Sequence, residues 1–174
     1  MKLLDIFKKK KQSNTYQSFD DHAKRIIADF AANDFLGKAA QAGHAAKDAV
    51  KAKEFDKAWG LFHEQKSFYG QHANRCGFTA RQLLALDSSV HEEIANILRI
   101  ERKHHDAMTN IVYWVLAGAE RPIKRHEQKF KAYFYRCKFE NTTLEQATKQ
   151  ISEQKNLPEY TLAQSIVSSW IAGG

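Results

Sequence analysis

Glu101 and His104 form the one E-x-x-H pair of the sequence, the spacing at which a carboxylate and an imidazole on one helix can bind the same metal ion. Di-iron bundles of that type also need a second E-x-x-H pair and two further carboxylates, and the sequence has no second pair. Three His-Glu pairs begin like the zinc-protease motif H-E-x-x-H, but no histidine closes any of them: His63-Glu64, His91-Glu92 and His126-Glu127. We therefore expect no metal and no other cofactor. A metal-dependent enzyme using Glu101 and His104 stays open as an alternative.

Other catalytic signatures are not found in the sequence. No phosphate-binding loop, dinucleotide fingerprint, Ser-His-Asp set or Cys-His set can be assembled from its motifs. Cys76 and Cys137 lie far apart and form no C-x-x-C pair, so we expect free buried thiols, with a disulfide between them left open. These observations favour a protein that is not an enzyme.

Glu101 and His104 lie within residues 88–118, a stretch that contains no Pro and no Gly before Gly118. The apolar residues recur at helical spacing, which predicts one long central helix. Glu93, Glu101, His104 and His105 fall on the same stripe as the apolar residues, and His72 from an earlier helix can pair with them. These five residues are the predicted buried polar layer. Either this layer is a hydrogen-bonded structural network, or it lines a groove for a polar side chain of a partner.

A second candidate surface is a helix predicted for residues 121–138, which carry seven cationic residues against one glutamate. Ile123, Phe130, Phe134 and Cys137 form its apolar stripe, and Tyr135 lies among the charges. The predicted partner-binding residues are Arg121, Lys124, Arg125, Lys129, Lys131, Tyr135, Arg136 and Lys138. Such a face can dock an acidic protein, bind nucleic acid through phosphates with Tyr135 stacked on a base, or simply be solvated.

Composition predicts an all-α fold, a single-domain bundle of about seven helices around the long central helix. The 174 residues include only two prolines and eight glycines, and the hydrophobic and charged fractions of 43% and 27% are ordinary for a globular protein. A capping box formed by Thr79 and Gln82 predicts a short helix ending near Leu86, and Ser89 would then cap the central helix.

We expect residues 1–17 to be a basic flexible tail and residues 18–172 to be the helical domain. Residues 1–12 contain five lysines against Asp5, and their one apolar turn can make weak contact with a membrane surface. The order of apolar and basic residues is not that of a signal peptide, and no apolar run is long enough to span a bilayer, which predicts a cytoplasmic protein. The helix after Ser18 should bury one face: Phe19, Ala23, Ile26, Ile27 and Phe30.

Residues 39–70 resemble the two-helix unit of a tetratricopeptide repeat. The resemblance rests on the small residues Ala42, Ala45 and Ala46, followed by Phe55, Ala58 and Phe62. The resemblance implies an antiparallel pair of helices whose small residues mark close contacts and whose aromatic residues fill the space between them. An ordinary antiparallel hairpin explains the same residues.

These features together favour a small, bacterial, cytoplasmic binding protein that recognises a partner protein and regulates, adapts or neutralises it, as an immunity protein does. The basic helix predicts an acidic partner, because opposite charge steers association. Nucleic-acid binding through the same helix is the alternative, although residues outside the two basic segments have a net charge of −3.

Overall fold

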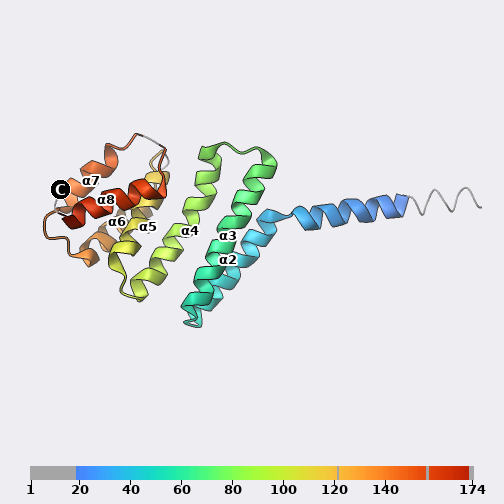
Figure 1. Cartoon of the computed structure of the whole chain (residues 1–174), viewed down its shortest axis with the longest axis horizontal. Coiled ribbons are helices and arrows are strands. Elements are labelled where there is room, and N and C mark those ends of the chain that lie inside the picture. Colours follow the sequence, from blue (N-terminus) through green and yellow to red (C-terminus); the bar gives the residue numbers. More distant parts are fainter. Residues whose placement is uncertain (1–18, 121, 156, 173–174) are drawn as a thin grey trace, which may run out of the picture. The chain divides into compact units, whose positions relative to one another are not determined.

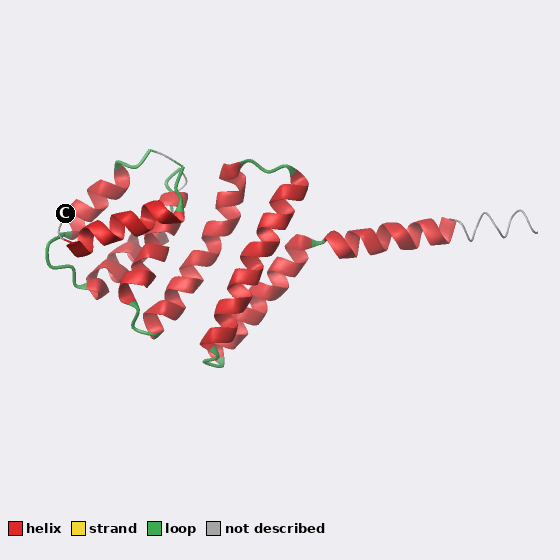
Figure 2. Ribbon diagram, viewed as in Figure 1, coloured by secondary structure: helices red, strands yellow, loops and turns green. Residues whose placement is uncertain are grey.

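A computed structural model describes residues 19–120, 122–155 and 157–172. Every regular element within these residues is a helix, so the predicted all-α class is confirmed (Figure 2). A first helix covers residues 19–33. It is followed by α2 (Phe35–Lys51), α3 (Phe55–Cys76), α4 (Ala80–Ile100), α5 (His104–Ala117), α6 (Lys124–Cys137), α7 (Leu144–Ser152) and α8 (Tyr160–Ala172).

The chain divides into two compact units, residues 1–35 and residues 36–174. The sequence predicted a boundary at residue 17, whereas the structure assigns helix 19–33 to the first unit and the helical bundle to the second. The whole of the predicted tail, residues 1–17, lies outside the described residues. Among the described residues, no helix has both the length and the apolarity that a membrane span requires.

Helix 19–33 does not bury the face that the sequence predicted. Phe19 and Phe30 are 74% and 72% exposed, and Ile26 and Ile27 are exposed as well. Asp20 forms an ion pair with Lys24 one turn later on the polar side. The sequence assigned this face to the core of a single domain, whereas the structure assigns the helix to a separate unit.

The predicted long central helix is two helices, α4 and α5, joined at Glu101, Arg102 and Lys103. The amide of Lys103 donates to the carbonyl of Leu98, and Arg102 adopts the left-handed conformation with φ 63°. These contacts form a Schellman motif, which terminates a helix and usually has glycine at the left-handed position. The chain therefore turns back on itself where the sequence contains no glycine or proline.

The start of α4 was also predicted too late. The capping box of Thr79 and Gln82 is confirmed, but the helix that it begins continues through Asp87 and Ser88 to Ile100. The predicted break at Ser89 was wrong, since its hydroxyl donates to the carbonyl of Leu86 inside the continuous helix.

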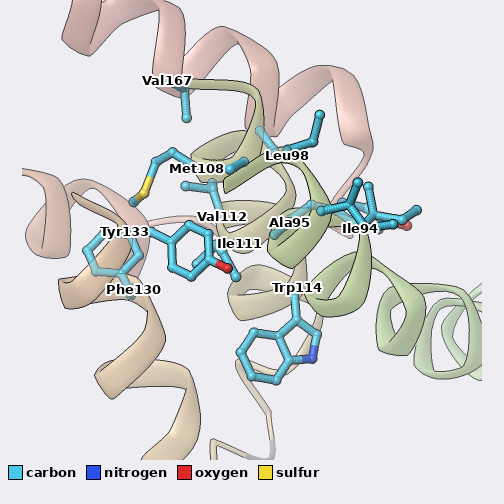
Figure 3. Packing of buried hydrophobic residues seen from close by; sticks show 14 of the residues in the cluster. Ile94, Ala95, Leu98, Met108, Ile111, Val112, Trp114, Phe130, Tyr133 and Val167 are labelled. Carbon is cyan, nitrogen blue, oxygen red and sulfur yellow. The ribbon is translucent and has the colours of Figure 1, made fainter. Parts of the chain in front are cut away.

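The core of the second unit is organised around α5, which packs against α4, α6 and α8. Met108, Ile111 and Val112 on α5 have no measurable exposure. Figure 3 shows them between Ala95 and Leu98 of α4, Phe130 and Tyr133 of α6, and Val167 of α8. In Figure 1, α4 runs between the α2 and α3 helices and the group formed by α5 to α8.

Ala42 and Ala46 of α2 are buried, as are Ala39 and Ala49, whereas Ala45 is exposed. Ala58 and Phe62 of α3 are buried too. Gly43 lies so close to α3 that a Cβ placed there would come within 2.8 Å of the Gln65 side chain. The Gln65 side chain of α3 thus lies against Gly43 of α2, and the resemblance to a tetratricopeptide unit stays a prediction.

Trp170 on the last helix, α8, is buried against three aromatic rings, those of Phe130, Phe134 and Phe139. Its indole Nε1 donates to Gln150 Oε1 at 2.6 Å, which connects α8 to α7. A capping box formed by Thr143 and Gln146 begins α7 and satisfies the amides at that helix end.

Candidate functional site

The five residues predicted as a buried polar layer do not gather in the structure. His105 is exposed, and His72, Glu93, Glu101 and His104 are only half-buried. Each of the two glutamates has a nearby lysine: Lys47 lies 3.5 Å from Glu93, and Lys103 lies 3.1 Å from Glu101. The layer was predicted on the assumption that residues 88–118 keep one helical phase, and the turn at residues 101–103 breaks that phase.

The E-x-x-H pair therefore does not lie on one helix. Glu101 caps the end of α4 and His104 begins α5, so the helix face that this spacing assumes is absent. Within the described parts of the chain, no three His, Cys, Asp or Glu side chains are grouped closely enough to hold a metal ion.

Among the described residues, six different polar residues are buried: Ser88, His91, Glu92, Thr109, Asn110 and His126. The sequence analysis placed none of them in the polar layer. His91 and Glu92 are adjacent on α4 and take part in two different sets of contacts, because the second half of α4 is surrounded by neighbouring helices. A pattern that assumes a single buried stripe misses residues on the other sides of such a helix.

We call the first set the His91 cluster, formed by Lys66, Asp87, His91, Asn110, Tyr113 and Tyr160. The side chain of His91 is only 5% exposed. Its Nδ1 lies 2.7 Å from Asn110 Oδ1, and its Nε2 lies 2.7 Å from Lys66 Nζ and 3.4 Å from Asp87 Oδ2. The cluster thus connects α3, α4 and α5 through one imidazole.

The hydrogen bonds of Asn110 make Nδ1 of His91 a donor. The amide nitrogen of Asn110 donates to the Asp106 carbonyl at 2.9 Å and to the Tyr160 hydroxyl at 3.1 Å, so its oxygen faces His91. That oxygen can only accept, so Nδ1 of His91 donates to it. Nε2, on the other side of the ring, faces both the Lys66 ammonium group and the Asp87 carboxylate.

Asp87 supplies the negative charge of the His91 cluster. Its Oδ1 lies 3.3 Å from Lys66 Nζ, and its Oδ2 accepts a hydrogen bond from the Tyr113 hydroxyl at 3.0 Å. Burial opposes ionisation of this carboxyl, but the contacts with His91, Lys66 and Tyr113 outweigh it and hold its pKa below the usual value. Burial and the Asp87 charge together raise the pKa of Tyr113, so the phenol stays protonated.

The second set, which we call the Glu92 cluster, connects α4 to α6. Glu92 is buried, and its Oε1 lies 2.6 Å from Arg125 Nη2 and 3.3 Å from Lys129 Nζ. Lys129 and the Tyr133 hydroxyl also donate to Asn96 Oδ1, at 3.3 and 2.8 Å. Because a buried carboxylate without a counter-charge is costly, Arg125 and Lys129 are held against the protein.

These contacts divide the basic residues of α6 into two stripes. Taking about 100° per residue, Arg125, Lys129 and Arg136 fall on an inner stripe that includes both cations of the Glu92 cluster. The outer stripe lies opposite the buried side of α6 and consists of Lys124, Lys131 and Tyr135, to which we add Lys138 at the left-handed C-cap of the helix. All four are exposed, with Tyr135 at 60%, and Arg125 and Arg136 of the inner stripe are exposed as well. Arg121 lies outside the described residues. The sequence predicted one cationic face and did not distinguish these two stripes.

The two cysteines differ in their surroundings. Both thiols are free. Cys137 is buried as predicted, and burial raises its pKa to about 12, which suppresses the reactive thiolate. Cys76 is exposed rather than buried and lies 3.7 Å from Nε2 of His72 on the same helix.

A pocket of about 190 Å³ opens between the first turn of α3 and the last turn of α4. Apolar residues including Phe55, Trp59 and Leu98 line it together with Glu101 and Lys103. No residue of the His91 cluster lines this pocket, so the buried network and the pocket do not combine into one site.

No protein-family model, no curated protein and no solved structure matches this chain.

Proposed function

We propose that this protein is a non-enzymatic, cytoplasmic binding module that recognises an acidic patch on a partner protein and regulates, adapts or neutralises that partner. The observation that carries the proposal is the outer stripe of α6, along which three exposed lysines and an exposed tyrosine are placed. Tyrosine and cationic residues are suited to such a surface because an aromatic anchor supplies contact area while the charges steer association.

The Glu92 cluster supports this proposal because it fixes the position of α6 against α4. Arg125 and Lys129 join α6 to the buried carboxylate of α4, while Phe130, Tyr133 and Phe134 are buried in the core. A surface held in place before binding loses little conformational entropy when a partner docks. The outer stripe is therefore suited to recognition without rearrangement.

The experiment is capture of binding proteins from a lysate of the source organism, using the full chain and two variants of equal charge. The α6 variant replaces Lys124, Lys131 and Lys138 with Ser and Tyr135 with Ala. The control variant replaces Lys51, Lys57 and Lys149 with Ser, three exposed lysines on other helices. Each capture is run with and without nuclease and is read by mass spectrometry.

We expect an acidic protein that survives nuclease and is captured by the natural chain and the control variant. The α6 variant should bind it at least about tenfold more weakly, since several charges and one aromatic anchor are lost together. Equal capture by all three chains would exclude the outer stripe. Material that disappears with nuclease would instead favour nucleic-acid binding through the same stripe, with Tyr135 available for base stacking.

A further inference from the structure

Helix 19–33 presents an exposed apolar face that the proposed function does not use. Phe19, Ala23, Ile26, Ile27 and Phe30 lie within about 100° of the helix circumference. Ala23 is half-buried and the other four side chains are exposed. Contiguous apolar surface of this kind marks an interaction site, because exposing it to water is unfavourable.

The described part of the helix is also short for an independent element. It contains 15 residues, and isolated helices of that length are marginally stable in water. A surface that covers the apolar face would stabilise it. The occupant must accept two phenylalanines and two isoleucines over about three helical turns.

The chain just before this helix indicates which surface that is. Lys8, Lys9, Lys10 and Lys11 form an uninterrupted cationic run, preceded by Leu3, Leu4, Ile6 and Phe7. These residues lie outside the described part of the chain, and only their charge and polarity are used here. A basic run binds anionic lipid headgroups, whereas an amphipathic helix inserts its apolar face at the boundary of headgroups and acyl chains.

We propose that helix 19–33 docks on an anionic lipid surface, with the lysine run as the second membrane signal. One weak signal gives marginal, reversible binding, and stable attachment takes two. The apolar face supplies buried area and the lysines supply electrostatic attraction. The inference does not rest on the function proposed for α6, because the two surfaces differ in residues and in ligand.

A second copy of the chain is a less suitable occupant. The apolar residues of helix 19–33 cover about two heptads, whereas helical pairing in a coiled coil requires three to four. Parallel pairing would also place Asp20 and Asp29 of each chain, which flank the apolar face, near the same residues of the other chain.

The test is flotation of the full chain with phosphatidylcholine vesicles containing about one third phosphatidylglycerol, compared with vesicles of phosphatidylcholine alone. The apolar-face variant is Ile27→Asn with Phe30→Ser. Its matched control is Ala28→Asn with Ala31→Ser, which lies away from the apolar face and lowers helix propensity at least as much. A third variant replaces Lys8 to Lys11 with Gln, and the α6 variant described above is included.

We expect the natural chain, the matched control and the α6 variant to float with the anionic vesicles. The apolar-face variant should bind at least about tenfold more weakly, and the lysine variant should lose roughly fivefold per lysine. Vesicles without phosphatidylglycerol should bind the natural chain weakly, because the lysine run then has no counter-charge.

Four results would overturn the proposal. The first is no flotation of the natural chain, and the second is equal flotation of the apolar-face variant, which would leave the lysines as the sole signal. The third is loss of flotation in the α6 variant, which would assign lipid binding to α6. The fourth is a dimer in sedimentation equilibrium that Ile27→Asn and Phe30→Ser abolish without any lipid binding, which would assign the face to a second copy.

Discussion

At the scale of single residues, the polar groups buried on α4 form ion pairs and hydrogen bonds with neighbouring helices. His91 contacts Lys66 of α3 and Asn110 of α5, while Glu92 lies beside Arg125 and Lys129 of α6. Adjacent positions on one helix thus stabilise two different interfaces. Removing one member of such a set leaves the others buried without a partner, which costs more than the bond itself contributes.

Replacing Asp87 with Asn should destabilise the protein by about 1–3 kcal/mol at neutral pH, because the half-buried Lys66 then loses its counter-charge. The pKa of Asp87 is below its ordinary value of 3.8, so the charged carboxylate is favoured in the folded state. The contribution of the charged carboxylate to the free energy of unfolding is complete above pH 3.8 and is lost as the pH falls through the lower, folded-state pKa. Urea unfolding of the natural protein and of Asp87→Asn at several pH values measures this contribution.

The two proteins should therefore differ most near neutral pH and converge on acidification below pH 3.8. The control is Asp48→Asn, which removes an exposed carboxylate paired with Lys51 and should leave stability unchanged. A difference between Asp87→Asn and the natural protein that does not vary with pH would contradict the role assigned to the Asp87 charge.

Gly118 ends α5 at a position where only glycine leaves room for a neighbouring ring. A Cβ at this position would overlap the imidazole of His126, which packs edge-to-face on Trp114 at 4.3 Å between ring centroids. Gly118→Ala should destabilise the protein by about 1–3 kcal/mol through overpacking. Chemical denaturation checks this value.

The matched control is Gly60→Ala in the exposed part of α3, where a Cβ meets nothing within 4 Å. That change should stabilise the protein by about 0.5–1 kcal/mol, since alanine is the better helix former. Equal stability of the two variants would show that the His126 ring is not confined by Gly118.

At the scale of elements, the turn between α4 and α5 depends on backbone hydrogen bonds rather than on a helix-breaking residue. Arg102 occupies a left-handed conformation that an L-residue adopts at a cost, with φ 63°. Arg102→Gly should therefore raise the free energy of unfolding by about 1 kcal/mol. Thermal and urea unfolding provide the measurement.

The control is Ala45→Gly, at an exposed position inside α2. Glycine is unfavourable within a helix, so this change should lower the free energy of unfolding by about 1 kcal/mol. If Arg102→Gly destabilised the protein to the same extent, residues 98–103 would have to be helical in solution, as the sequence predicted for residues 88–118.

The elements that could be predicted from sequence were those with local end signals. Thr79 with Gln82 marks the start of α4, and Gly77, with φ 64°, marks the end of α3. The end of α4 could not be predicted, because Arg102 performs there the role that glycine usually has. The missed turn shifted the helical phase, and so the predicted polar layer contained neither His91 nor Glu92.

The basic surface of α6 could be predicted only in part, because the prediction used the spacing within that helix alone. The basic composition and the apolar side of α6 follow from helical spacing alone. The division into outer and inner stripes depends on Glu92, which lies 33 residues before Arg125 in the sequence. Spacing within one helix carries no information about such a tertiary partner.

At the scale of the whole molecule, the net charge of +7 arises from two basic segments, residues 1–12 and 121–138, on a chain that is otherwise mildly acidic. We assign these segments to different ligands, the first with helix 19–33 to a lipid surface and the second to an acidic protein. Both interactions should weaken as salt is raised, because the charges involved are exposed.

The most direct test of the central claim is the affinity of the captured acidic partner for three purified proteins: the natural chain, the α6 variant and the control variant lacking Lys51, Lys57 and Lys149. Isothermal titration at about 0.15 M salt should give similar dissociation constants for the natural chain and the control, and one at least about tenfold higher for the α6 variant. If the two variants bound the partner equally weakly, the loss of affinity would be due to net charge and not to the outer stripe. An unchanged affinity of the α6 variant would contradict binding through the outer stripe.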